Sequence, residues 1–121
     1  AIDVTVDYVK LRKAFGKSLL DFQNTQFVLA DCKAEAVVAR TFLDEYIARL
    51  GRGELSPEEG AIAKLWTCET QCRVVDKCLQ LFGGYGYMME YPIARMYADA
   101  RVQRIYGGTS EIMRLLIARA L

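Results

Sequence analysis

Two glycine-rich segments contain the residue types in this sequence that could bind a ligand. The first, YGGTS at residues 106–110, places two glycines and two hydroxyls directly before a predicted helix. The first turn of a helix presents unpaired N–H groups, so this segment could bind an anion or the polar edge of a ligand. Threonine and serine are also ordinary helix N-caps. A ligand site and a plain capped turn therefore explain this segment equally well.

The second segment, FGGYG at residues 82–86, follows a predicted helix. A helix C-terminus carries negative partial charge, so this segment alone is a poor phosphate site, and a C-cap with left-handed glycines explains it better. A dinucleotide-binding fingerprint needs a strand, then glycines, then a helix, and that order is absent. The local density of aromatic rings nevertheless favours a flat ligand or another domain nearby. These rings belong to Phe82, Tyr85, Tyr87 and Tyr91.

A third segment, RKAFGKSLLDFQ at residues 12–23, joins basic side chains to an aromatic ring, a turn glycine and Gln23. Arg12 and Lys13 end a predicted helix, where they could meet a phosphate group. Basic residues at that position are also simple partners of the helix dipole. Composition alone does not decide between these two roles.

Several classes of chemistry are excluded or disfavoured by composition. The 121 residues include no histidine, which removes the commonest general base and metal ligand, so acid–base chemistry must come from a carboxylate, a tyrosine or a lysine. The four cysteines show no CxxC spacing and occur in apolar helical contexts, which predicts reduced thiols in an intracellular protein. Cys68 and Cys72 lie one helical turn apart, but no further ligands complete a tetrahedral zinc site, so no metal is predicted.

Charge and hydropathy exclude two kinds of partner. Sixteen basic and 15 acidic residues give a net charge of +1, which argues against nucleic-acid binding. The apolar runs are a few residues long, whereas a membrane span needs about 20. The chain opens with AIDVTVDYVKLRK, without an initiator methionine, a targeting signal or an N-cap, which suggests a piece of a longer protein.

The hydrophobic pattern predicts an all-α fold, an up-and-down four-helix bundle with an additional short helix. The clearest helix start is SPEE, with Ser56 as N-cap, Pro57 at the first helical position and Glu59 completing a capping box. Asp21 is a predicted N-cap and Gly51 a predicted C-terminal stop. No strand of useful length is predicted. The expected helices cover about residues 1–13, 21–50, 57–82, 92–102 and 110–121.

Taken together, RKAFGKSLLDFQ, QLFGGYGYMMEYPIARMYADAR and RIYGGTSEIMRLLIAR resemble the C-terminal helical domain of flavin-dependent acyl-CoA dehydrogenases. The resemblance covers residues 1–121 and implies that the N-terminal and middle domains are absent. In that family, tetramers hold FAD between domains and across a subunit interface. A carboxylate removes an α-proton from an acyl-CoA thioester while the β-hydrogen leaves as hydride to the flavin. Electrons then pass to an electron-transferring flavoprotein.

The resemblance implies a set of cofactor contacts. Arg12 matches an arginine that contacts the FAD pyrophosphate of a neighbouring subunit, with Phe15 and Gln23 beside the cofactor. Ala14 stands in the same cofactor-binding stretch where some members carry a threonine, so a hydroxyl contact is missing there. The stretch that lies along the FAD of the partner subunit is matched by Gln80, Leu81, Phe82, Gly83 and Gly84. The helix start that meets the cofactor is matched by Thr109, Ser110 and Glu111, and a glycine near the thioester by Gly108.

The resemblance also shows that one catalytic group is missing. Gly107 occupies the position where many members carry the catalytic glutamate of a YEGT motif, and glycine has no side chain to accept a proton. Glu111 lies about one helical turn further on, so we expect it to point elsewhere. YGGT is similar to the long-chain and isovaleryl-CoA subgroup, in which the glutamate comes from a position that falls before Ala1. No catalytic residue is predicted in this chain, which is expected to be inactive alone.

Two alternatives remain at this level. The chain could be a non-catalytic helical interaction or assembly module, or part of an acyl-CoA oxidase-like enzyme. Under the preferred hypothesis the cofactor is FAD, and the partners are acyl-CoA, electron-transferring flavoprotein and further copies of the chain. Wide apolar faces on the second and third predicted helices favour such self-association. The expected location is the cytoplasm of a bacterium or the mitochondrial matrix of a eukaryote.

Overall fold

The computed structural model describes all 121 residues and is almost entirely helical. Two short 3₁₀ helices, η1 (Leu19–Asp21) and η2 (Gly83–Tyr87), and a small antiparallel hairpin of β1 (Lys13–Ala14) and β2 (Lys17–Ser18) join the main elements. The α-helices are α1 (Ile2–Leu11), α2 (Gln23–Gly51), α3 (Pro57–Phe82), α4 (Pro92–Val102) and α5 (Ser110–Ala118).

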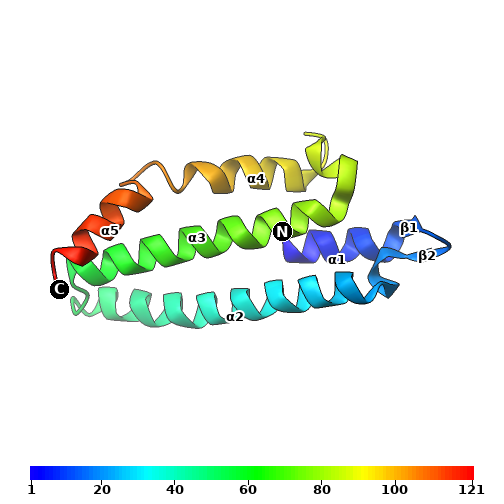
Figure 1. Cartoon of the computed structure of the whole chain (residues 1–121). Helices are drawn as coiled ribbons and strands as arrows, with labels where there is room; N and C mark the ends of the chain where they lie inside the picture. The colour runs from blue at the N-terminus through cyan, green and yellow to red at the C-terminus, as the bar shows by residue number, and fades with distance from the viewer.

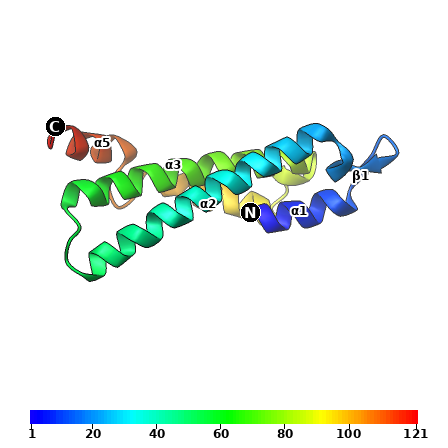
Figure 2. The same cartoon turned by 90° about the horizontal axis from the view of Figure 1, so that it is seen from below.

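Helices α1 to α4 run alternately in opposite directions (Figure 1). The long helices α2 and α3 lie antiparallel, α1 covers one half of this pair, and α4 packs along α3. The short helix α5 folds back near the N-terminal end of α3, as the view from below also shows (Figure 2). This arrangement confirms the predicted up-and-down bundle with an additional short helix.

Helix α3 is the centre of the structure because it contacts each of the other four α-helices. The core gathers around its second half, where Val74, Val75 and Cys78 face α2 and α4. Ile93 of α4 belongs to this core and is completely buried, and α1 packs against the core through Ile2 and Val4. Full burial of a side chain of this size contributes about 1.5–3 kcal/mol. The groups carried by α3 are therefore held on a well-packed support.

The predicted capping box at the start of α3 is confirmed. The Glu59 N–H donates to Ser56 Oγ at 3.2 Å, and the Ser56 N–H donates to Glu59 Oε2 at 2.9 Å. Glu59 also forms an ion pair with Arg49 at 2.7 Å, which ties the end of α2 to the start of α3. Hydrogen bonds from Ser56 and Arg49 lower the pKa of Glu59.

The predicted start of α2 is wrong by a small but instructive margin. Phe22, rather than Asp21, occupies the N-cap position of α2. Asp21 instead accepts a hydrogen bond from the Ser18 N–H at 3.0 Å, because the preceding hairpin turns the chain into η1 and brings this donor within reach. The helix before it, α1, ends at Leu11, two residues before the predicted Lys13.

Other boundaries also depart from prediction. Gly51 is the last residue of α2 rather than its stop, and the positive φ that ends the turn belongs to Gly53, at +72°. Residues 83–87 form η2 instead of an open loop, and within that segment only Gly83 has a positive φ, at +58°. Helix α5 ends at Ala118 and does not reach Leu121.

None of the helices is at once long enough and apolar enough to cross a lipid bilayer. No cluster of three or more cysteine, aspartate or glutamate side chains could hold a metal ion. All four cysteines are free, and Cys32 and Cys78 are buried.

Candidate functional site

A groove of about 710 Å³ lies where the hairpin, the start of α2 and the end of α3 meet. Twelve residues line it, and seven of these were assigned to the cofactor from the sequence. They form two groups that are more than 60 positions apart in the sequence, and the packing of α1 against α3 brings the two groups together. The seven are Arg12, Ala14, Gln80, Leu81, Phe82, Gly83 and Gly84.

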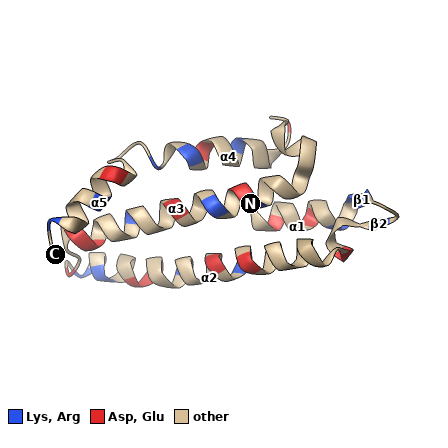
Figure 3. Cartoon of the chain, in the orientation of Figure 1, with Lys and Arg blue, Asp and Glu red and all other residues tan.

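Arg12 supplies the free positive charge of this groove. Its guanidinium carbon lies 5.5 Å from the centre of the Tyr85 ring, a distance at which a cation is attracted to the aromatic face. No carboxylate forms an ion pair with Arg12, whereas many other basic side chains are paired. Figure 3 marks basic positions on the ribbon beside β1, and acidic positions on the neighbouring α1. An unpaired guanidinium here is well suited to bind a phosphate group.

An aromatic cluster forms the wall beside Arg12. The rings of Tyr8 and Phe82 are stacked with centroids 4.0 Å apart, and Tyr91 meets both edge-on. The Tyr8 hydroxyl donates to the Phe82 carbonyl at 3.2 Å. Burial raises the pKa of Tyr8, and the positive charge of Arg12 offsets only part of this increase. The hydroxyl therefore stays a neutral donor. The sequence analysis missed Tyr8, which carries no motif signal beyond its place on an apolar helix face.

The glycines of the groove leave its floor open. A Cβ added to Gly83 or Gly84 would meet no protein atom within 4 Å. Gly83 needs its positive φ, but Gly84 lies outside the left-handed region, so nothing in this chain requires glycine there. An open floor beside an unpaired guanidinium fits an extended anionic ligand that approaches the backbone closely, as FAD would.

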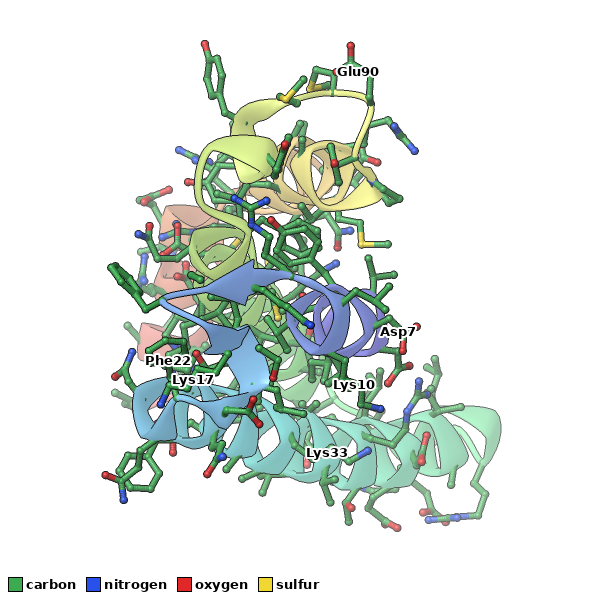
Figure 4. The ribbon with its side chains drawn as sticks, turned by 90° about the vertical axis from the view of Figure 1, so that its right-hand side faces the viewer. Asp7, Lys10, Lys17, Phe22, Lys33 and Glu90 are labelled. Carbon is green, nitrogen blue, oxygen red and sulfur yellow. The ribbon has the colours of Figure 1, made fainter.

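Two predicted contacts, Phe15 and Gln23, do not line the groove. Phe15 projects from the hairpin turn with φ of +51° and is 96% exposed. Figure 4 looks onto this end, where Lys17 and Phe22 lie together at the start of α2, with the Lys17 ammonium 4.1 Å from the centre of the Phe22 ring. Phe15 and Gln23 therefore contact a cofactor only if it extends beyond the groove, and their roles stay predictions.

The segment YGGTS lies elsewhere, beside the first half of α3. Thr109 is the N-cap of α5 and its hydroxyl accepts the Ile112 N–H at 3.2 Å, which confirms the capping role. Gly107 and Gly108 both have positive φ, at +61° and +93°. The Thr109 N–H donates to no backbone carbonyl, so it is an available donor at this helix start, whereas the Glu111 N–H donates to the carboxylate of its own side chain.

Ser110 is less available to a ligand than the sequence implied. Its side chain is buried, and its hydroxyl donates to Glu69 Oε1 at 2.8 Å. Its N–H donates to the Arg104 carbonyl at 3.1 Å. Both donors of Ser110 thus have partners within the chain, and a contact with the cofactor stays a prediction.

Glu111 does not have the properties of a general base. Its side chain is 80% exposed. Hydrogen bonds from its own backbone N–H and from the Thr109 hydroxyl lower its pKa, and the charge of Arg114 adds to this effect. A carboxylate stabilised in its ionised form is a weak proton acceptor near neutral pH. Glu111 therefore does not replace the side chain that Gly107 lacks.

Two α3 residues that the sequence analysis missed support this second region. The Lys64 ammonium donates to the carbonyls of Gly108 and Gln103. Burial would raise the pKa of Glu69, but hydrogen bonds from Ser110 and Arg104 outweigh it and lower the pKa. The only signal that could have found Lys64 and Glu69 is their charge on an otherwise apolar stretch of helix.

The two regions do not form one pocket. Lys64 and Gln80 lie 16 residues apart on α3, which corresponds to about 24 Å along the helix axis. The structure therefore brings Arg12 and residues 80–84 together and leaves residues 107–111 at a separate place.

Comparison with known proteins agrees with the motifs and the geometry. The family model described as acyl-CoA dehydrogenase, C-terminal domain, matches residues 1–121. This chain belongs to the acyl-CoA dehydrogenase family. A mitochondrial long-chain specific acyl-CoA dehydrogenase of Sus scrofa is 50% identical over 117 residues, covering 97% of this chain and 27% of the relative.

Solved structures of family members share the fold. An acyl-CoA dehydrogenase from Geobacillus kaustophilus superposes with a TM-score of 0.93 at 45% identity, covering 98% of this chain and 31% of that one. A glutaryl-CoA dehydrogenase from Mycobacterium smegmatis, solved in complex with FADH2, gives a TM-score of 0.92 at 27% identity, with the same two coverages. The chain thus spans between a quarter and a third of the length of these acyl-CoA dehydrogenases.

Proposed function

We propose that this chain is the cofactor-contacting and assembly domain of an FAD-dependent acyl-CoA dehydrogenase. The full-length protein oxidises an acyl-CoA to a trans-2-enoyl-CoA and passes the electrons to an electron-transferring flavoprotein. The observation that carries the proposal is the groove in which Arg12 meets residues 80–84. Seven residues that the family resemblance assigned to FAD line one surface, although they come from two distant parts of the sequence.

Five residues of the groove have defined roles under this proposal. Arg12 binds the cofactor pyrophosphate through charge-assisted hydrogen bonds, and Tyr85 holds the guanidinium in place. Gly83 and Gly84 let the backbone approach the ligand, and Gln80 supplies an amide beside them. Bound FAD supplies the hydride acceptor of the reaction.

The second region serves a different cofactor molecule. The separation of about 24 Å along α3 keeps residues 107–111 away from the groove. We therefore assign the groove to the FAD of a neighbouring subunit and the start of α5 to the FAD of the same subunit, with Gly108 beside the thioester. One chain then contributes to two cofactor sites, which requires at least two copies of the chain in the assembly.

The catalytic base comes from outside these residues. The atom nearest to an added Cβ on Gly107 is Lys64 Cε at 3.8 Å, which belongs to a cationic donor and not to an acceptor. Glu111 is exposed and stabilised in its ionised form. The chain alone is therefore inactive, and a glutamate of the full-length protein removes the α-proton.

The exposed apolar side chains support an assembly role. One set follows the length of α2 and a second set lies on α5, and solvent exposure of large apolar groups has no benefit for a monomer. A contact between copies would bury both sets. They include Phe27, Val37, Val38, Ile47 and Leu50 on α2, and Ile112, Leu115 and Leu116 on α5.

Flavin titration of the full-length protein tests the function. We expect Arg12→Gln to weaken FAD binding by about 10- to 100-fold, because a hydrogen bond to a charged group contributes about 1.5–3 kcal/mol. Lys10→Gln is the matched control, since Lys10 is an exposed cation on the same helix that does not line the groove. Equal binding by both variants would exclude the groove as a flavin site.

The same protein separates the two alternatives. Rapid anaerobic reduction of its flavin by acyl-CoA, with slow reoxidation by oxygen, supports the dehydrogenase. Fast reoxidation by oxygen indicates an oxidase-like enzyme. A wild-type protein that binds no flavin indicates a helical interaction module and refutes the proposed function.

A further inference from the structure

We propose that Lys64 and Glu69 of α3 are positioning residues that fix the backbone of residues 103–110, and thereby the surface that Gly107, Gly108 and Thr109 present to a ligand. The inference rests on the proposed function of these three residues. It assigns to two side chains outside the recognised motifs the task of holding one of those motifs in shape.

Lys64 connects the two ends of the segment. Its ammonium is half-buried and donates to the Gln103 carbonyl at 3.3 Å and to the Gly108 carbonyl. These carbonyls flank the exposed part of the loop, so one side chain draws both ends toward α3. Lys64 forms no ion pair, and its ammonium therefore depends on these carbonyls for its protein contacts.

Glu69 holds the flanking side chains. It accepts the Ser110 hydroxyl at 2.8 Å and the Arg104 Nε at 3.0 Å, and its second oxygen lies 2.9 Å from Arg104 Nη2. Arg114 on α5 lies 3.7 Å away. The Glu69 side chain is only 21% exposed, so solvent weakens these contacts little. One carboxylate thus holds Arg104, which precedes the two glycines in the chain, and Ser110, which follows them.

Backbone hydrogen bonds from Ile105 and Tyr106 to Val102 and from Ser110 to Arg104 also shape this segment, but its side chains are poorly buried. The side chains of Ile105 and Tyr106 are 54% and 58% exposed, so they contribute little burial. Gly107 and Gly108 follow, and glycine has the largest conformational freedom of any residue. A segment with few apolar contacts opens easily unless polar contacts restrain it. Lys64 and Glu69 lie about 7.5 Å apart along α3 and restrain it from two points.

Hydrogen–deuterium exchange of the full-length protein without substrate tests the restraint directly. We expect Lys64→Met and Glu69→Gln to speed amide exchange at residues 104–111 by about tenfold, the effect of losing one hydrogen bond to a charged group. Lys77→Met is the matched control, because Lys77 is a lysine of the same helix that pairs with Glu35 away from the segment. Unchanged exchange at residues 104–111 in both test variants would overturn the proposal.

Kinetics of the same variants separate positioning from general stability. We expect Lys64→Met to raise the KM for acyl-CoA about tenfold, with a melting temperature close to that of Lys77→Met. Lys64→Arg should bring the KM most of the way back to the wild-type value, because arginine keeps the hydrogen-bond donors. An unchanged KM, with an apparent kcat that falls only in proportion to the folded protein lost, contradicts a positioning role. Should Lys64→Met fail to fold, Glu69→Gln gives the same comparison.

The two proposals fail separately. Faster exchange at residues 104–111 in the variants, together with a wild-type protein that binds no flavin, would refute the proposed function and leave the restraint by Lys64 and Glu69 intact. Normal flavin reduction with unchanged exchange in the variants would refute the restraint and leave the function intact.

Discussion

Gly86→Ala tests how η2 is packed against the end of α3. Gly86 is buried, and a Cβ built on it would lie 2.6 Å from the Leu79 carbonyl oxygen and 3.0 Å from Leu79 Cγ. The oxygen belongs to the backbone of α3, so it cannot rotate away as a flexible side chain would. To accommodate the methyl group, η2 must therefore move away from α3, and this movement changes the shape of the groove that η2 borders.

The size of the effect follows from this contact. Overpacking of a well-packed site costs about 1–3 kcal/mol. The contact with backbone places Gly86→Ala in the upper part of that range, about 2–3 kcal/mol. For a domain of this size, 1 kcal/mol corresponds to about 4 °C in melting temperature, so we expect a decrease of about 8–12 °C.

Gly84→Ala is the matched control in the same 3₁₀ helix. An added Cβ there meets no atom within 4 Å and its φ is outside the left-handed region. We expect unchanged or slightly higher stability, by up to about 1 kcal/mol, because alanine restricts the unfolded chain. Under the proposed function the new methyl group occupies the groove floor, so flavin binding weakens.

Calorimetry and circular dichroism of the flavin-free proteins at equal concentration measure the first effect, and flavin titration measures the second. The expected result is a crossed pattern in which Gly86→Ala loses stability and Gly84→Ala loses flavin affinity. A melting temperature of Gly86→Ala within about 2 °C of the wild type, or an equal decrease in both variants, would refute the packing argument.

Two further predictions concern α3. Burial opposes ionisation of Glu69, but its hydrogen bonds lower its pKa in the folded state, so these interactions stabilise the fold above the unfolded carboxyl pKa and are lost as the pH falls through the folded pKa. Urea unfolding between pH 7 and pH 3 should therefore show a smaller pH dependence of the unfolding free energy for Glu69→Gln than for the wild type. An equal pH dependence in the two proteins would contradict this. Ser56→Ala removes the α3 N-cap and should cost about 1 kcal/mol, measurable as a decrease of about 4 °C in melting temperature, whereas no change would show that the cap is replaced.

Local sequence patterns predicted most of the helices. Ser56, Pro57 and Glu59 mark the start of α3, and Pro92 and Thr109 mark the starts of α4 and α5. These signals work because a helix start is defined by hydrogen bonds within about four residues. Asp21 misled for the same reason, since the hairpin before it offered its carboxylate a nearer donor, the Ser18 N–H.

The order and types of residues within three motifs determined which family the chain belongs to, and the glycine at 107 predicts that the catalytic carboxylate comes from another position. Only the tertiary structure decided that Arg12 and residues 80–84 share a groove while residues 107–111 lie near Lys64, which is about 24 Å from Gln80 along α3. It also decided the contacts of Lys64 and Glu69, whose partners lie more than 30 residues away in the chain. The hydrophobic periodicity of a sequence indicates which face of a helix is buried. The contacts between helices depend on how the helices pack against one another, and no local sequence pattern encodes this packing.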